Sequence, residues 1–260
     1  MRIRRPAGDV TDRVTLKILR LTNSNDFNPA IPEELRGAAL TEAIVRAALD
    51  EPVETISRSF WPSERFPPIL NEWLDRYEPD LVFIRSAAYW VSFESVPLRF
   101  ERKLGWLGKW PAKVGNKIGS EPTIATNWLA RRARRVAVRT IGGDTYFTPA
   151  AAAQHVEDML RVIVTRESVV ALVRGPGHTH NSAGTRSAYA RAQRRNQAFE
   201  AELKAVCGRM RVAYVSAFSA AAASALSADD VHTVEGGERA FAEVEGPAIV
   251  KAWRGREENG

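Results

Sequence analysis

The sequence is poor in cysteine: only Cys207, among 260 residues, carries a thiol. A single cysteine can form neither an internal disulfide framework nor a cysteine-ligated zinc site. No apolar run reaches the roughly 18 residues at which a transmembrane helix is suspected. The first residues, MRIRRPAGDVTDR, are basic and lack the apolar stretch of a secretory signal. Together these absences favour a reduced, cytoplasmic protein.

The sequence also lacks the glycine patterns that bind phosphates. Neither G-x-G-x-x-G nor G-x-x-x-x-G-K-[ST] occurs, and the pairs Gly142-Gly143 and Gly236-Gly237 are weak signals. We therefore expect no nucleotide-dependent chemistry, and nothing in the sequence indicates another cofactor.

What the sequence does have is a globular composition, 45% hydrophobic and 26% charged, with enough apolar residues for a sizeable core. Strand-like and helix-like pieces alternate, which favours a mostly parallel sheet with helices on both faces. We predict a three-layer α/β/α sandwich whose five strands cover Thr15–Leu21, Val53–Arg58, Asp80–Ser86, Ser168–Arg174 and Arg211–Ser216. The predicted helices cover Pro32–Leu49, Pro67–Tyr77, Pro149–Val164, Gly184–Val206 and Gly237–Trp253.

Residues 91–144 interrupt the alternation and are longer than one crossover needs, so we expect an inserted helical cover within a single domain of residues 1–260. Between residues 99 and 139, eleven Lys or Arg face only two Glu, so this segment carries +9 and the rest of the +6 chain sums to −3. The insert is either a solvated cover or a lid whose cationic face attracts an anionic substrate, a phospholipid surface or nucleic acid. Because the charge belongs to one segment, nucleic-acid binding is the least favoured of these. The sequence does not indicate an oligomeric state.

The first predicted strand ends in polar residues 22–26 (TNSND), which form either an ordinary turn or the rim of an active site. In open α/β sheets, ligands bind beyond the carboxyl ends of the strands, which is where Ser24 lies. Asp229 and His232 are three residues apart before the last predicted helix. A carboxylate at this spacing can orient one ring nitrogen and leave the other free as a general base, a role for which Asp230 is less well spaced. Ser24, His232 and Asp229 are therefore a candidate nucleophile, base and orienting acid.

These blocks resemble those of the SGNH (GDSL-like) hydrolases. Residues 18–24, ILRLTNS, are similar to the family's I-L-x-L-G-D-S block, and Asp229, His232 and Gly237 match its D-x-x-H block with the glycine that follows. The stretch EPDLVFIRSAAYW resembles the third strand, P-D-L-V-x-I…G-x-N-D, and RNQAFEAELKAV resembles the penultimate helix. The resemblance implies a flavodoxin-like sandwich without a cofactor, with Ser24 as nucleophile. It also implies esterase, lipase, thioesterase or carbohydrate O-deacetylase activity on a small-molecule ester.

The groups that would hold an oxyanion depart from the family pattern. No glycine lies between Gly37 and Gly105, so the second block falls within Ser57–Phe60, and Tyr89 stands where the third block has its asparagine. Loss of one oxyanion donor costs about 10²–10³-fold in rate. The alternatives are therefore a non-catalytic relative that binds a carbohydrate or acyl ligand, or an acyltransferase.

Four residues are candidates to replace the missing oxyanion donors. They are Asn23 and Asn25 beside the serine, Ser59 after the second strand, and Tyr89. A backbone N–H near Ser59 needs no glycine to donate, and a tyrosine hydroxyl is an acceptable donor.

The remaining histidines give weaker signals. His178 and His180 lie in RGPGHTHNSAGT after the fourth strand, where we expect a rim loop that contacts substrate. A metal would need a third ligand at fixed spacing, and none is evident, so no metal site is predicted. His155 is expected to be structural and Asn196 to be a surface residue.

Overall fold

The computed structural model describes residues 15–104, 128–226 and 231–259. Its sheet has five parallel strands in the order β2-β1-β3-β4-β5. They are β1 (Leu16–Thr22), β2 (Val53–Ser59), β3 (Leu81–Arg85), β4 (Val170–Arg174) and β5 (Ala213–Val215). This is the flavodoxin-like order, so the predicted fold class is confirmed.

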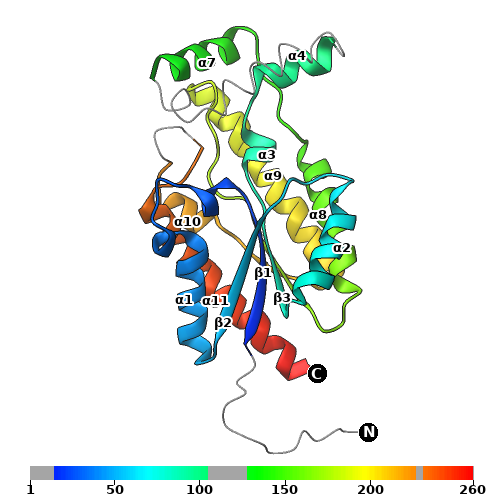
Figure 1. Cartoon of the computed structure of the whole chain (residues 1–260). Helices are drawn as coiled ribbons and strands as arrows, with labels where there is room; N and C mark the ends of the chain where they lie inside the picture. The colour runs from blue at the N-terminus through cyan, green and yellow to red at the C-terminus, as the bar shows by residue number, and fades with distance from the viewer. Residues whose placement is uncertain (1–14, 105–127, 227–230, 260) are drawn as a thin grey trace, which may run out of the picture.

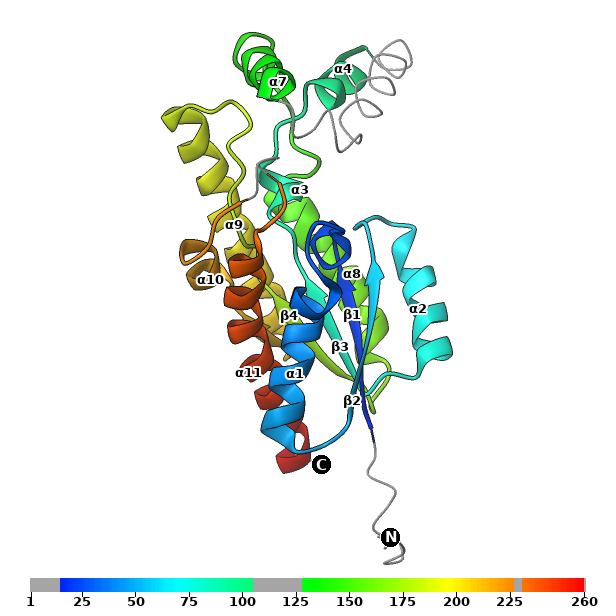
Figure 2. The ribbon, with the colours of Figure 1, turned by 60° about the vertical axis from the view of Figure 1, so that its left-hand side comes forward.

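Helices cover both faces of this sheet (Figures 1 and 2). One face carries α1 (Gly37–Leu49) and α11 (Glu235–Asn259); the other carries α2 (Phe66–Tyr77), α8 (Pro149–Val164) and α9 (Arg186–Met210). Successive strand residues point to opposite faces and fill two separate cores. Leu16 and Ile18 pack on the α1/α11 side, whereas Leu19 and Leu21 pack on the α8/α9 side.

Short elements follow the carboxyl ends of the strands. They are η1 (Ser24–Phe27) and η2 (Glu33–Leu35) after β1, α3 (Tyr89–Ser92) after β3, and α10 (Phe218–Ala222) after β5. Two further helices, α4 (Val96–Leu104) and α7 (Trp128–Thr140), lie at this same end of the molecule, at the top of Figure 1. The interpretation of residues 91–144 as an insertion stays a prediction.

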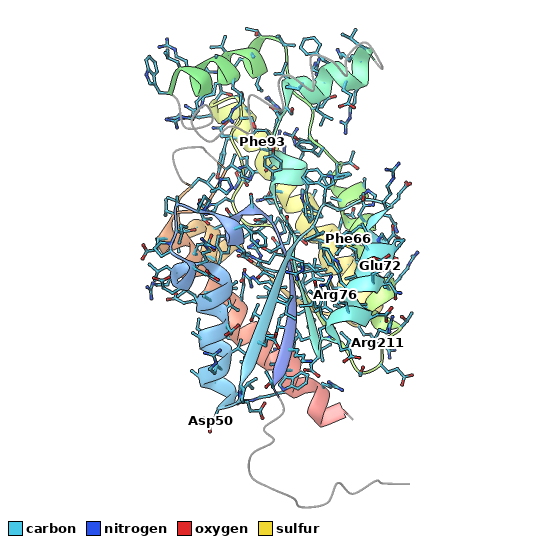
Figure 3. The ribbon with its side chains drawn as sticks, viewed as in Figure 1. Asp50, Phe66, Glu72, Arg76, Phe93 and Arg211 are labelled. Atoms are coloured by element: carbon cyan, nitrogen blue, oxygen red, sulfur yellow. The ribbon has the colours of Figure 1, made fainter. Side chains whose placement is uncertain are left out.

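Local chemistry fixes the helix ends. The side chains of Thr148 and Thr185 accept hydrogen bonds from backbone N–H groups in the first turns of α8 and α9, as N-caps do. Asp50 and Arg211, at the lower end of the molecule in Figure 3, end α1 and α9 in the left-handed region, with φ of 54° and 55°.

The predicted helix over Pro32–Leu49 is wrong at its start. Arg36 is extended, with ψ of 153°, so a separate 3₁₀ turn precedes α1, which begins at Gly37. The Gly37 N–H donates to Glu238 Oε2 of α11 at 3.0 Å, a contact distant in sequence that no local pattern reports.

The crossing of α1 and α11 gives a stability prediction. A Cβ on Gly246 would lie 2.5 Å from Ile44 Cγ2, so the two helices approach too closely for a side chain. We expect Gly246→Ala to lower the free energy of unfolding by about 1–3 kcal/mol, although alanine is the better helix former. Gly208→Ala in α9, where a Cβ meets no atom within 4 Å, should raise it by roughly 0.5–1 kcal/mol. Urea denaturation measures both, and a shift of the same sign in the two variants would contradict this packing.

Candidate active site

Ser24 lies directly beyond β1, at the first position of η1, and is exposed. Asn23 precedes it in an extended conformation, and its Oδ1 accepts the Asn25 N–H at 3.1 Å. This side-chain turn stops the strand and lifts the serine hydroxyl out of the sheet. The Ser24 N–H opens a helical turn, and such first N–H groups have no partner within the helix.

His232 comes from the other end of the chain and meets this serine. Its Nε2 lies 2.9 Å from Ser24 Oγ, within hydrogen-bond distance. The neighbouring residue fixes the approach, because the Thr233 N–H donates to Asn25 Oδ1 at 3.3 Å and the Thr233 hydroxyl donates to Glu238. The structure therefore brings together Ser24 and His232, two of the three residues expected at the site. Asp229 and Asp230 lie outside the described residues.

The candidate oxyanion donors differ in what they do. Asn23 and Asn25 use their carbonyl oxygens to build the serine turn and to hold Thr233. Ser59 is exposed at the end of β2, where it is paired in register with Thr22 of β1. It is therefore next to the strand that carries the serine turn.

Tyr89, the fourth candidate, belongs to an aromatic cluster. Its ring stacks on Phe93 and on Tyr146, with centroids 4.5 and 5.4 Å apart. Its hydroxyl lies 3.5 Å from that of Tyr146. Burial, with the nearby Tyr146, raises the pKa of Tyr89, so the phenol stays protonated and can donate.

Beneath the serine turn lies a buried set of charges, the arginine–carboxylate cluster. Its members are three strand arginines and two carboxylates, each with a side chain at most 4% exposed: Arg20, Arg85, Arg174, Asp26 and Glu245. Asp26 accepts from Arg20 Nε at 2.6 Å and from Arg85 Nη1. Glu245 of α11 lies 2.8 Å from Arg20 Nη2, 3.0 Å from Arg85 Nε and 3.5 Å from Arg174 Nε.

The pKa values in this cluster follow from its geometry. Burial alone would raise the pKa of Asp26, but Arg20 and Arg85 hold it well below its usual range. Burial would likewise raise the pKa of Glu245, which the same arginines and Arg174 lower. Burial and the positive charge of Arg85 lower the pKa of Arg174 to about 9. Asp26 is thus a held carboxylate two residues after Ser24, and it anchors the serine turn from below.

Sequence reasoning missed this cluster, although a signal was present. Arg20, Arg85 and Arg174 each stand at an alternate position in a strand predicted to be covered on both faces, two residues after Ile18, Phe83 and Leu172. A charge in such a strand must be paired, because an unpaired buried charge is too costly.

No family model and no curated protein matches the chain. Solved structures do: a lipase/acylhydrolase from Enterococcus faecalis is 19% identical, with a TM-score of 0.55, over 92% of this chain and 96% of its own. TesA is 14% identical, with a TM-score of 0.56, over 91% and 99%. Est24, a carbohydrate acetylesterase from Sinorhizobium meliloti, is 11% identical, with a TM-score of 0.54, over 91% and 98%.

The chain has the fold of the SGNH hydrolases. The expected resemblance is thus confirmed for the fold. At these identities the catalytic roles of Ser24, His232 and Asp229 stay predictions.

Within this SGNH fold, the loop after β4 differs from expectation. His180 is 5% exposed, its N–H donates to Ser92 Oγ at 3.2 Å, and its ring meets the edges of Tyr89 and Phe93. It therefore lies inside the protein and not on a rim open to substrate. No group of three metal-ligating side chains occurs within the described residues.

His178 forms a second serine–histidine contact. Its Nε2 lies 2.8 Å from Ser224 Oγ, but that hydroxyl also donates to the Ala220 carbonyl at 2.7 Å. With its one proton committed, Ser224 can only accept from an Nε2–H of His178. Burial, with His180 and Arg174, lowers the pKa of His178 to about 4 and keeps the ring neutral. In this arrangement the Ser224 hydroxyl gives no proton to His178, as a nucleophile would give one to its base. The Ser224–His178 pair therefore serves as a control for the Ser24–His232 pair.

Two further expectations concern residues near these loops. Asn196 is 1% exposed, not a surface residue, and its Nδ2 donates to the Gly177 carbonyl at 3.0 Å and to Thr179 Oγ1 at 3.1 Å. It holds the loop that carries both histidines. The ring of His155 meets the edge of Phe147 at 5.1 Å, in line with a packing role.

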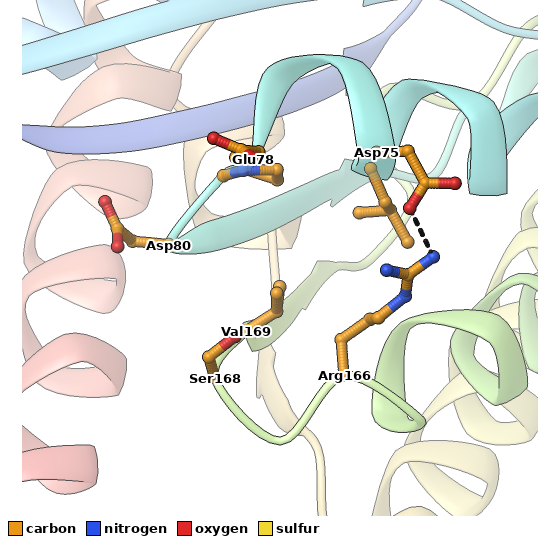
Figure 4. A pocket seen from close by; sticks show the side chains of 8 residues that line it. Asp75, Glu78, Asp80, Arg166, Ser168 and Val169 are labelled. Carbon is orange, nitrogen blue, oxygen red and sulfur yellow. Dashed lines mark ion pairs between the residues drawn. The ribbon is translucent and has the colours of Figure 1, made fainter.

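A pocket of about 340 Å³ lies at the opposite end of the sheet, beside the start of β3 and the turn before β4 (Figure 4). Three of its charged side chains, Asp75, Asp80 and Arg166, are already engaged. Asp75 pairs with Arg166 at 2.7 Å, and Asp80 accepts the Lys17 N–H at 2.9 Å. Since it lies at the amino end of the strands, it takes no part in the Ser24 site.

No helix in the described part of the chain is long and apolar enough to cross a membrane.

Proposed function

We propose that the protein is a serine hydrolase that cleaves an ester through an acyl-enzyme. The observation that carries this proposal is the 2.9 Å contact between Ser24 Oγ and His232 Nε2 at the carboxyl end of the sheet. A nucleophile within hydrogen-bond reach of a base is the arrangement that acyl transfer requires.

In the first step, Ser24 Oγ attacks the acyl carbonyl while His232 Nε2 takes the hydroxyl proton. The tetrahedral intermediate collapses, the ester C–O bond breaks, and the imidazolium gives its proton to the leaving alkoxide. In the second step, water attacks the acyl-enzyme with His232 again as base, and the acid and free Ser24 are released. Asp229 would orient the imidazole and balance its charge, as the D-x-x-H spacing predicts.

The oxyanion would be held by the Ser24 N–H together with a second donor. The side-chain amides of Asn23 and Asn25 support that role, because their carbonyl oxygens are engaged and their nitrogens remain as donors. Tyr89, kept protonated by burial, is a further candidate for the second donor.

The substrate class proposed is a small acyl ester or an O-acetyl group on a carbohydrate or lipid. Structures of similar fold include a carbohydrate acetylesterase and an acylhydrolase, which supports acetyl and short-chain esters as the first substrates to assay. Product analysis with added sugar acceptors would detect acyl transfer in place of hydrolysis.

Active-site labelling tests this function. A fluorophosphonate probe reacts with an activated serine, so the parent protein should label and Ser24→Ala should not. Ser224→Ala is the matched control and should label like the parent, because its hydroxyl is bound to Ala220. Labelling that persists in Ser24→Ala, or a parent protein that neither labels nor cleaves short esters, would overturn the proposal.

A further inference from the structure

The two helices at the top of Figures 1 and 2, α4 and α7, form what we call the basic cap. Helix α7 carries five arginines in 13 residues (WLARRARRVAVRT) and no acidic residue. Helix α4 adds Arg99, Arg102 and Lys103 against Glu101. The cap lies at the same end of the sheet as Ser24, and its two helices together carry eight Lys or Arg against one Glu.

One face of α7 is held against the body of the protein. Val138 packs on Ala183 and Ala188, and Arg139 Nε donates to the Ala183 carbonyl at 2.7 Å. The Arg134 guanidinium lies 5.4 Å from the centroid of the Phe93 ring, which Figure 3 labels just below the cap. These contacts fix which face of the helix points outward.

The outward face of α7 displays large apolar side chains where a solvated helix is normally polar. Leu129, Arg132, Ala133 and Val136 follow the helical spacing of three, four and seven residues, and all are exposed. Leu129 is 58% exposed and Val136 is 47% exposed, and Trp128 at the helix start reaches 60%. Aliphatic and aromatic side chains displayed between arginines are typical of helices that lie in a membrane interface.

The charge of α4 is partly balanced, since Arg99 and Arg102 lie 3.5 and 3.8 Å from the carboxylate of Asp144. Lys103 and Leu104, at its end, are exposed and repeat the pairing of a cation with an apolar side chain.

We propose that the basic cap docks on an anionic lipid surface. Positive side chains near such a surface are attracted by its negative potential, while Trp128, Leu129 and Val136 would enter the headgroup region. A nucleic acid would satisfy the arginines but offers no apolar layer to the aliphatic side chains, so a lipid fits the whole surface better. This docking does not depend on hydrolysis by Ser24.

Vesicle co-sedimentation of the full chain tests the proposal. The protein should sediment with phosphatidylcholine vesicles that contain phosphatidylserine, not with phosphatidylcholine alone, and salt should release it. Each basic residue removed should weaken binding about fivefold, so Lys103→Gln with Arg132→Gln should weaken it about 25-fold. Arg76→Gln with Lys251→Gln removes the same charge from exposed sites on α2 and α11 and should leave binding unchanged.

A second pair of variants tests the apolar contact. Leu129→Ser with Val136→Ser should also weaken vesicle binding, whereas Ile69→Ser with Val164→Ser, exposed on α2 and α8, should not. Ser24→Ala should bind like the parent, which separates docking from catalysis. Equal binding to both vesicle types, equal losses in cap and control variants, or tight RNA binding that Leu129→Ser with Val136→Ser leaves intact would each overturn the lipid assignment.

Discussion

His232→Ala is expected to lower kcat/KM for a short-chain acyl ester by roughly 10⁴- to 10⁶-fold, the loss that follows removal of one member of a nucleophile–base pair. Without the imidazole, the Ser24 hydroxyl loses the ring nitrogen that lies 2.9 Å from it and that we propose as its base. Steady-state hydrolysis of p-nitrophenyl acetate, corrected for spontaneous hydrolysis, measures the effect.

Non-additivity distinguishes a catalytic pair from two separate contributions. Ser24→Ala should lower kcat/KM about as much as His232→Ala. The double variant should be no slower than either, because each single substitution already removes the function of the pair. His178→Ala, which removes the histidine of the other serine–histidine contact, should keep kcat close to the parent value. An additive loss in the double variant, or a similar loss in His178→Ala, would contradict the assignment.

The sheet was predictable because most of its strands are short, largely apolar runs, as expected for strands covered on both faces. β4, predicted as Ser168–Arg174, is found as Val170–Arg174, and β2 ends one residue beyond its predicted Arg58. The contact between Ser24 and His232 was predictable from the order of the elements. Ser24 follows the carboxyl end of β1, and His232 precedes the last helix, α11. What placed them together was topology, which the strand pattern largely determines.

The rest depended on contacts between residues far apart in sequence. Asn196 looks like a surface residue within RAQRRNQ, yet it is buried because α9 lies against the loop after β4. Glu245 sits in a helix rich in charges, and only the packing of α11 on the sheet turns it toward Arg20 and Arg85. The candidate oxyanion donor Asn25 depends in the same way on a distant contact, because its Oδ1 accepts the N–H of Thr233, 208 residues away.

Asp26→Asn is expected to lower the free energy of unfolding by about 3–5 kcal/mol, the cost of removing one partner from a buried ion pair. The substitution conserves size but removes the charge that Arg20 and Arg85 share, and leaves Glu245 as the remaining carboxylate of the cluster beside its three arginines. Because Asp26 anchors the turn that carries Ser24, turnover should fall as well. Urea denaturation measures the stability change, and Asp75→Asn, which breaks an exposed ion pair with Arg166, should cost less than about 1 kcal/mol.

The pH dependence of stability gives a second test of the cluster. The pKa values of Asp26 and Glu245 are lowered in the folded state, so the unfolded chain binds more protons as the pH falls below about 4.5. The stability that these carboxylates contribute is therefore fully present above that pH and is lost progressively in acid. A folded Asp26→Asn protein lacks one of the two titrating groups, so its stability should decline less steeply than that of the parent between about pH 5 and pH 3. An identical acid slope in the two proteins would mean that Asp26 is not held as a charged partner of Arg20 and Arg85.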